Sequence, residues 1–529
     1  MIEIGFHRFP FMDVNSAFAG LLLLASGPDS QDLSDRFRPI RDLKHFKSWI
    51  DALEKYFGSK LPPKTSVADS SMKDGSTVAL DWDRLVEVDA SVTLSLFRQI
   101  EVKPSADLLL SLCKLAKIGF DRKDPLKYPD DRHAALTNYA DALLCFNVDP
   151  DGLVCGSWRS WFSAWKHSLD SWNSRNQPFS AVPKLMYLSL LPSVAVQFDQ
   201  SGPFADVFDA WNAAMVEVCN NPDAMRFDNV EIQTANLIFN IGSCVFKDGG
   251  GELRKNMAAF VELMTLLEKC LAKMDLNSTP DMTLNRVLSG FTYLRWACMQ
   301  QRGPVAQSDI YADKLPSQDL LATLEKRYIR QNENPDKITD DSCTTAAELL
   351  YLLKKLECKP SAALFNALIT RVYQRLDQLD ANRVEKVLCY SGEACVAFIS
   401  PAGERRLKVD KSSPSDVSFY WQDFWRKWFV AAEKFLRNPV YSSQLKAAIG
   451  MPYLLSVVID AAYRGQLLSD FRRVQPLWEK RLEEVMNDKK TSKGRARRRT
   501  TFFRVFAMKR EFNWSFDPAL FKRIKESEW

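Results

Sequence analysis

The chain has 529 residues, too many for one compact core, so we expect several domains or an extended array of repeats. Apolar residues make up 46% and charged residues 26%, which excludes a disordered chain and is typical of a folded protein. The net charge of +5 is uneven: residues 489–510 hold ten lysines and arginines and no acidic residue, so the rest of the chain sums to −5 (+5 − 10).

The cysteines and histidines argue against disulfides and metals. Eleven cysteines occur singly, many of them inside apolar helical patterns, which predicts buried thiols. All four histidines lie in the first third of the chain, and none has a cysteine at ligand spacing, so no metal site is predicted. The chain also lacks the phosphate-binding, nucleophile-elbow, zinc-protease and dinucleotide motifs, so we predict neither catalytic residues nor cofactors.

The first predicted element is an N-terminal helical segment over residues 1–60. Within it, residues 41–58 form an amphipathic pattern that ends at Gly58. The apolar run at 17–25 is preceded by Glu3 and Asp13 rather than by a basic stretch, so we interpret it as a buried helix and not a signal peptide. A polar stretch with two prolines then predicts a linker over residues 61–77.

A helical-repeat domain is predicted over residues 78–400, where helical patterns follow one another with short breaks. The patterns form four pairs: 105–120 with 131–146, 230–246 with 252–274, 281–299 with 317–329, and 346–356 with a helix that begins after Ser361. Each pair is apolar on more than one side and must stack on its neighbours, which predicts an all-α fold, an irregular α-solenoid of antiparallel helix hairpins. The pairs are unevenly spaced, so one large irregular helical domain is the alternative.

The last of these pairs has a close counterpart earlier in the chain. The sequence KPSAALF at 359–365 repeats KPSADLL at 103–109, with Ser361 and Ser105 as predicted N-caps. A tryptophan-rich helix follows each copy at a similar distance, with Trp158, Trp161, Trp165 and Trp172 in one and Trp421, Trp425 and Trp428 in the other. We expect these tryptophans to pack helix interfaces; stacking on bases is the alternative. The repetition suggests a duplicated module.

The C-terminal part combines a helical region over residues 418–488 with a basic and aromatic tail over residues 489–529. We expect the cations to repel one another and keep the tail extended until an anion neutralises it, and Phe512, Trp514 and Phe516 alternate at strand spacing. Cations that hold phosphates and aromatics that stack on bases are the ingredients of RNA binding. The candidate nucleic-acid-binding residues are Lys489, Lys490, Lys493, Arg495, Arg497, Arg498, Arg499, Phe502, Phe503, Arg504, Lys509 and Arg510. A nuclear localisation signal and a solvated linker are the alternatives.

Phrases such as TANLIFNIGSCVF at 234–246 and TLNRVLSGFTYLRWA at 283–297 resemble the octotricopeptide and heptatricopeptide repeats. Such helical repeats occur in organellar RNA-binding proteins, including the FAST-kinase-like proteins of mitochondria, although the RAP domain that often closes those chains is not found here. The resemblance implies a mitochondrial location, with nucleus or cytoplasm as alternatives, and RNA partners such as rRNA or organellar transcripts.

These features together predict a non-catalytic RNA-binding protein. We expect an accessory component of the mitochondrial ribosome or of organellar RNA processing, bound to other proteins of a ribonucleoprotein complex. No apolar run is long enough to cross a bilayer, so no membrane partner is expected. The alternative is an α-solenoid scaffold that binds proteins and no nucleic acid.

Overall fold

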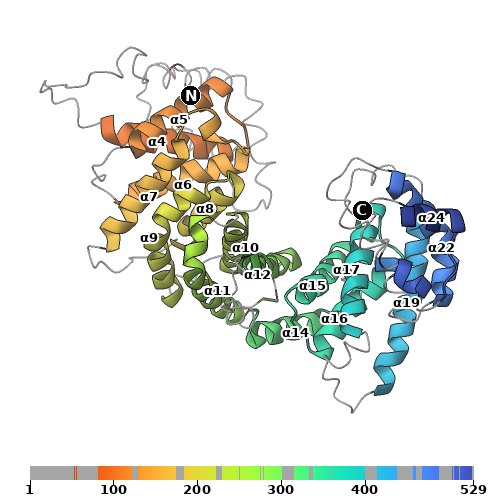
Figure 1. Cartoon of the computed structure of the whole chain (residues 1–529). Coiled ribbons are helices and arrows are strands. Elements are labelled where there is room, and N and C mark those ends of the chain that lie inside the picture. Colours follow the sequence, from red (N-terminus) through yellow and green to blue (C-terminus); the bar gives the residue numbers. More distant parts are fainter. Residues whose placement is uncertain are drawn as a thin grey trace, which may run out of the picture. The chain divides into compact units, whose positions relative to one another are not determined.

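The chain folds into helices stacked in layers (Figure 1). Helices account for most of the residues that the structure describes, and no strand occurs among them, which confirms the all-α, solenoid-like prediction. The computed structural model describes residues 53, 55, 82–99, 101–121, 129–173, 184–221, 229–248, 251–274, 276–277, 279–300, 315–332, 338–358, 360–399, 414–437, 457–459, 468–487, 503, 505–510 and 513–526. Most of the predicted helix at 41–58 lies outside these residues; within it, Leu53 is helical and buried.

The contacts divide the chain into two compact units, Met1–Leu266 and Leu267–Trp529. In unit 1, one layer of helices stacks in the order α4, α6, α8, α10, and a second layer stacks in the order α5, α7, α9 and the short helix η3. The bounds are α4 Trp82–Gln99, α5 Ala106–Phe120, α6 Pro129–Phe146, η1 Pro150–Gly152, α7 Ser157–Asn173, α8 Lys184–Gln197, α9 Ser201–Asn220, α10 Val230–Lys247, η3 Glu252–Asn256 and α11 Met257–Ala272, which contains the boundary between the units.

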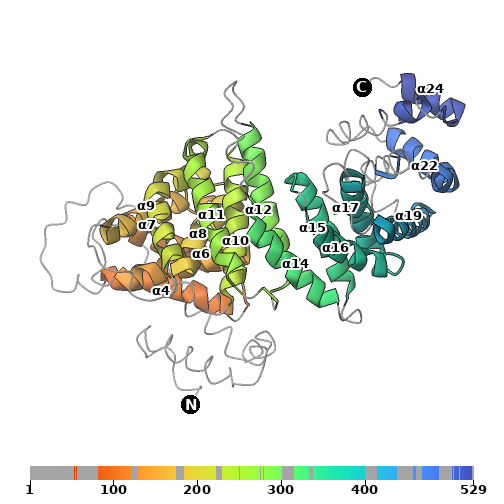
Figure 2. The ribbon, with the colours of Figure 1, turned by 90° about the horizontal axis from the view of Figure 1, so that it is seen from below.

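Unit 2 repeats this plan, as Figure 2 shows for its successive helices. One layer stacks in the order α12, α15, α17, α19, α22, and α14 packs against α16 in a second layer. The bounds are α12 Asp281–Gln300, α14 Gln318–Asn332, α15 Asp340–Lys355, α16 Ala362–Arg375, α17 Ala381–Ile399, α19 Pro414–Arg437, α22 Leu468–Asn487 and α24 Pro518–Glu526.

The layered arrangement corrects three of the predicted helix pairings. α5 and α6 meet edge to face at Phe120 and Tyr139, whose ring centroids are 5.1 Å apart, but α6 packs chiefly against α4. Likewise, α12 packs against α15, and α14 against α16. In the pair predicted over 230–246 and 252–274, α10 packs chiefly against α8, and η3 packs against α9. The reason is that an apolar stripe must be covered by the next helix of its own layer, not only by its neighbour in sequence.

The pair formed by α15 and α16 folds as predicted. Ser361 caps α16, because its hydroxyl oxygen accepts a hydrogen bond from the backbone N–H of Leu364 at 3.0 Å. Leu353, Leu368 and Val372 are all completely buried. The two helices pack against each other as an antiparallel hairpin.

The duplicated module suggested by the sequence is present in the structure. Ser105 and Ser361 have the same backbone angles, φ −60° and ψ 158°, and each caps its helix. The preceding Glu101 and Glu357 both adopt left-handed conformations, with φ of 53° and 54°. The helices of the first module, α4 to α7, therefore correspond to α15, α16, α17 and α19 of the second.

Two contacts between helices recur in the modules. Arg98 of α4 pairs with Asp141 of α6 at 2.8 Å, and Lys354 of α15 pairs with Glu393 of α17. The indole N–H of a tryptophan on the last helix donates to a backbone carbonyl of the preceding one: Trp161 to Leu136 at 2.8 Å, and Trp428 to Leu388 at 3.1 Å. Between α9 and α8, Trp211 and Leu188 make the same bond at 2.9 Å.

Five of the seven tryptophans named in the sequence serve packing, as predicted, and the side chains of the other two, Trp172 and Trp421, lie outside the described part of the chain. Trp158, Trp161, Trp165, Trp425 and Trp428 are buried and meet one another edge to face. They are not available to stack on bases. Most of the cysteines are buried as expected, whereas Cys145 and Cys155 are exposed.

Candidate nucleic-acid interface

The C-terminal end of unit 2 is built on α22. Its Phe471 and Trp478 contact the rings of Trp514 and Phe516, with centroids 5.6 Å and 6.0 Å apart. The indole N–H of Trp514 donates to the side-chain oxygen of Gln475 at 3.0 Å. Residues 513–517 are thereby fixed along α22, and α24 follows directly from them.

Trp514 and Phe516 are separated by one residue, and both lie on the buried side of this irregular segment. Trp514 is 7% exposed and also lies under the guanidinium of Arg472, 5.1 Å from the ring centroid. The strand considered for this region is not formed among the described residues, and Phe512 lies outside them. Trp514 is a structural anchor and is excluded as a base-stacking group.

Residues 505–510 are helical and are anchored to α24. Val505 and Met508 are completely buried, and Phe506 meets Phe521 of α24 edge to face, with centroids 5.3 Å apart. The ammonium of Lys509 lies 4.1 Å from the centroid of the same Phe521 ring. The expectation of an extended tail is therefore wrong for these six residues, because apolar contacts with α24 stabilise a helix against charge repulsion.

Three of the predicted RNA-binding residues lie within the described part of the chain, and all three are on the surface. Phe503 is 63% exposed, and Lys509 and Arg510 are exposed as well. Residue 503 and residues 505–510 are all helical. The other nine lie outside the described residues: Lys489, Lys490, Lys493, Arg495, Arg497, Arg498, Arg499, Phe502 and Arg504.

The same end of unit 2 carries cations that the sequence prediction did not include. Lys480 of α22 and Lys522 and Lys525 of α24 are exposed. Lys522 pairs with Glu526 at 3.9 Å, and the neighbouring Arg523 pairs with Glu483. The three lysines could have been identified only once α24 was known to pack beside residues 505–510, because they lie outside the acid-free run.

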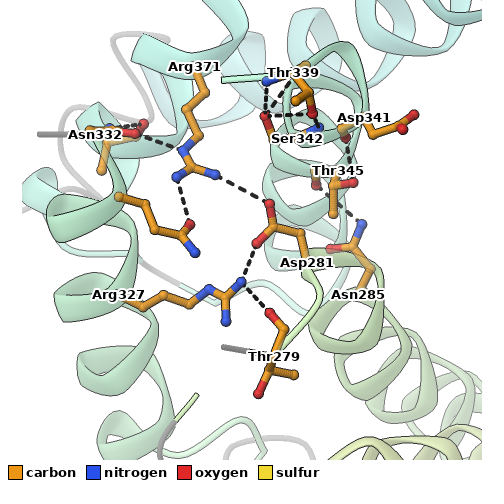
Figure 3. Close-up of polar contacts among 12 residues, drawn as sticks. Thr279, Asp281, Asn285, Arg327, Asn332, Thr339, Asp341, Ser342, Thr345 and Arg371 are labelled. Carbon is orange, nitrogen blue, oxygen red and sulfur yellow. Dashed lines mark hydrogen bonds and ion pairs between the residues drawn. The ribbon is translucent and has the colours of Figure 1, made fainter. Parts of the chain in front are cut away.

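A second polar site in unit 2 connects α12, α14 and α16 (Figure 3). Its centre is Asp281 at the start of α12, whose carboxylate accepts from Arg327 at 2.5 Å and from Arg371 at 3.3 Å. Arg327 and Arg371 are 2% and 3% exposed. Arg371 also donates to Asn332 at 2.7 Å and to Gln331 at 2.6 Å.

The groups in this cluster fix helices rather than activate a reactant. Arg327 donates to two backbone carbonyls, those of Leu276 and Thr279, just before α12 begins. Both oxygens of the Asp281 carboxylate accept from guanidiniums, Oδ1 from Arg327 and Oδ2 from Arg371, so the carboxylate holds the two arginines in place. Burial raises the pKa of the neighbouring Tyr328 hydroxyl, which keeps it protonated. We interpret the cluster as a polar joint between three helices.

Comparisons with protein-family models, with curated proteins and with solved structures found no match for this chain. Within the described ranges, no group of three or more histidine, cysteine, aspartate or glutamate side chains is placed to hold a metal ion. In the same ranges, no helix is both long and apolar enough to cross a membrane.

Proposed function

We propose that this chain is a non-catalytic RNA-binding protein whose layered helices present a basic and aromatic C-terminal surface. The observation that supports the proposal is that Phe503, Lys509 and Arg510 are all exposed, at the end of a run of ten cations without an acid. Cations neutralise phosphates, and an exposed phenyl ring stacks on a base. The resemblance to organellar repeat proteins favours RNA over DNA, and an accessory role in the mitochondrial ribosome or in organellar RNA processing.

The test measures binding of the full-length protein to a fluorescent single-stranded RNA. Replacing Lys509 and Arg510 with glutamine should weaken binding and lower the slope of log affinity against log salt by about 1.4, which is about 0.7 for each lost phosphate contact. The matched control replaces two exposed cations of α7 in unit 1, as Arg159→Gln with Lys166→Gln, and should change neither quantity.

The other candidate function, an α-solenoid scaffold for proteins, predicts a different outcome. A scaffold without nucleic-acid partners would show no measurable affinity for the RNA at low salt. The double variant of Lys509 and Arg510 and its control would then not differ in RNA binding. That result would contradict the RNA proposal.

A further inference from the structure

A partly exposed pair of stacked tyrosines lies on the second module, on neighbouring helices of one layer. Tyr351 of α15 and Tyr390 of α17 have ring centroids 4.5 Å apart and an angle of 18° between their planes. The ammonium of Lys355 lies 4.9 Å from the centroid of Tyr351, and that of Lys386 lies 5.6 Å from the centroid of Tyr390. We call these four residues the tyrosine face.

The charge around the tyrosine face is positive. Lys386 pairs with Glu348 at 3.0 Å, and Glu393 receives both Lys354 and Lys355, the latter at 3.6 Å. Three lysines thus meet two carboxylates. None of these lysines is fully buried, so a ligand in solvent can reach them.

The first module shows that the fold does not require these side chains. The N-caps Ser105 and Ser361 align α4 with α15, so residues 95 and 99 correspond to residues 351 and 355. The shared ion pair and indole bond align α6 with α17, so residues 134 and 138 correspond to residues 386 and 390. At these four positions the first module has Ser95, Gln99, Ala134 and Asn138. The same core and the same ion pair therefore form without the tyrosines and without the two lysines.

Resting on the RNA-binding function proposed above, we infer that the tyrosine face is a second RNA-binding site, specific for strands with unpaired bases. Aromatic rings stack on exposed bases, and ammonium groups bind the adjacent phosphates. A lysine side chain is flexible, so Lys355 or Lys386 can leave its ring for a phosphate while a base takes its place on the tyrosine. A base within an A-form duplex is not open to such stacking, so the site favours single strands.

The test transfers the first module's residues into the second: Tyr351→Ser, Lys355→Gln, Lys386→Ala and Tyr390→Asn in one full-length variant. Each new residue already occupies the equivalent position of the first module, so the helix packing is expected to tolerate it. The probes are a fluorescent single-stranded oligouridylate and a blunt-ended RNA duplex. We expect the variant to bind the oligouridylate about tenfold or more weakly, the effect of losing at least one stacked base, and the duplex with a smaller loss.

The control changes the first module, as Ser95→Ala with Asn138→Ala, and should leave the affinity for oligouridylate unchanged. Thermal unfolding of both variants checks that the fold is retained. If the wild-type protein binds the oligouridylate and the four-residue variant binds it equally well, the inference is overturned while the proposed function stands. If the wild-type protein binds neither probe, the proposed function itself fails, and this inference fails with it.

Discussion

Glu268 shows how burial acts on a single residue. Its side chain is 1% exposed, and one carboxylate oxygen accepts a hydrogen bond from the backbone N–H of Ser317, at the start of α14, at 2.6 Å. Burial is the main cause that raises the pKa of this carboxyl group to about 7, and the Ser317 hydrogen bonds oppose it. Between pH 4.5 and about 7, the folded state therefore keeps a proton on Glu268 that the unfolded state releases.

The sign of the resulting pH dependence follows from linkage. Because the pKa of Glu268 is raised from 4.5 to about 7, its contribution to stability is fully present below pH 4.5 and is lost as the pH rises through about 7. Glu268→Gln keeps the acceptor for Ser317 and removes the charge. We predict that urea unfolding at pH 8.5 finds this variant more stable than the wild type by about 3 kcal/mol, and that the difference shrinks toward pH 5.

The control for this prediction is Glu262→Gln on the exposed side of the same helix, α11. It should leave the pH dependence of unfolding as it is in the wild type. A pH-independent difference between wild type and Glu268→Gln would show that Glu268 stays charged in the folded protein.

At the scale of elements, the hairpin of α15 and α16 depends on a continuous apolar stripe. Leu368 is completely buried in it. Leu368→Ala should lower the free energy of unfolding by about 2 to 5 kcal/mol, the range for deleting a core leucine. Asn366→Ala, on the partly exposed side of α16, is the control and should change stability little. A loss below about half a kilocalorie for Leu368→Ala would mean that this stripe is not the packed face.

The contribution of the tryptophan hydrogen bonds to helix packing can be tested in α7, because two of its buried tryptophans differ in the hydrogen bonding of the indole N–H. Trp161 donates to the Leu136 carbonyl, whereas the indole N–H of Trp158, equally buried, has no hydrogen-bond partner within the described residues. Replacement by phenylalanine removes similar volume at both positions. Trp161→Phe should therefore cost about 1 kcal/mol more than Trp158→Phe in chemical unfolding. Equal costs would mean that the bond to Leu136 adds nothing to stability.

Much of the fold could be predicted at this scale, and the limits have physical reasons. Periodicity identified the buried stripe of α16 and the cap at Ser361, because both depend on residues close in sequence. It shows which side chains are buried but not which helix covers them, so α5 was paired with α6. The Asp281 cluster joins residues up to ninety positions apart, and no local pattern marks it. At the candidate interface, the alternation of Phe512, Trp514 and Phe516 predicts strand spacing, but it does not show that α22 covers Trp514.

At the scale of the molecule, the two modules show which positions the fold constrains and which it leaves open. The caps, the ion pair between the first and third helices and the indole bond recur in both. The side chains that differ include Leu115 of α5 and its counterpart Arg371, which joins the Asp281 cluster. The partly exposed side of α15 and α17 also differs, and it carries the tyrosine face. A repeated scaffold thus leaves its surface free to acquire separate functions.

The most direct test of RNA binding is the salt dependence of affinity for a single-stranded RNA. Arg495, Arg497, Arg498 and Arg499 belong to the acid-free run. If they contact phosphates, replacing all four with glutamine weakens binding to every RNA sequence alike and lowers the slope of log affinity against log salt by roughly 3. Wild-type affinity and an unchanged slope in this variant would contradict RNA binding by the acid-free run and favour a protein-binding scaffold.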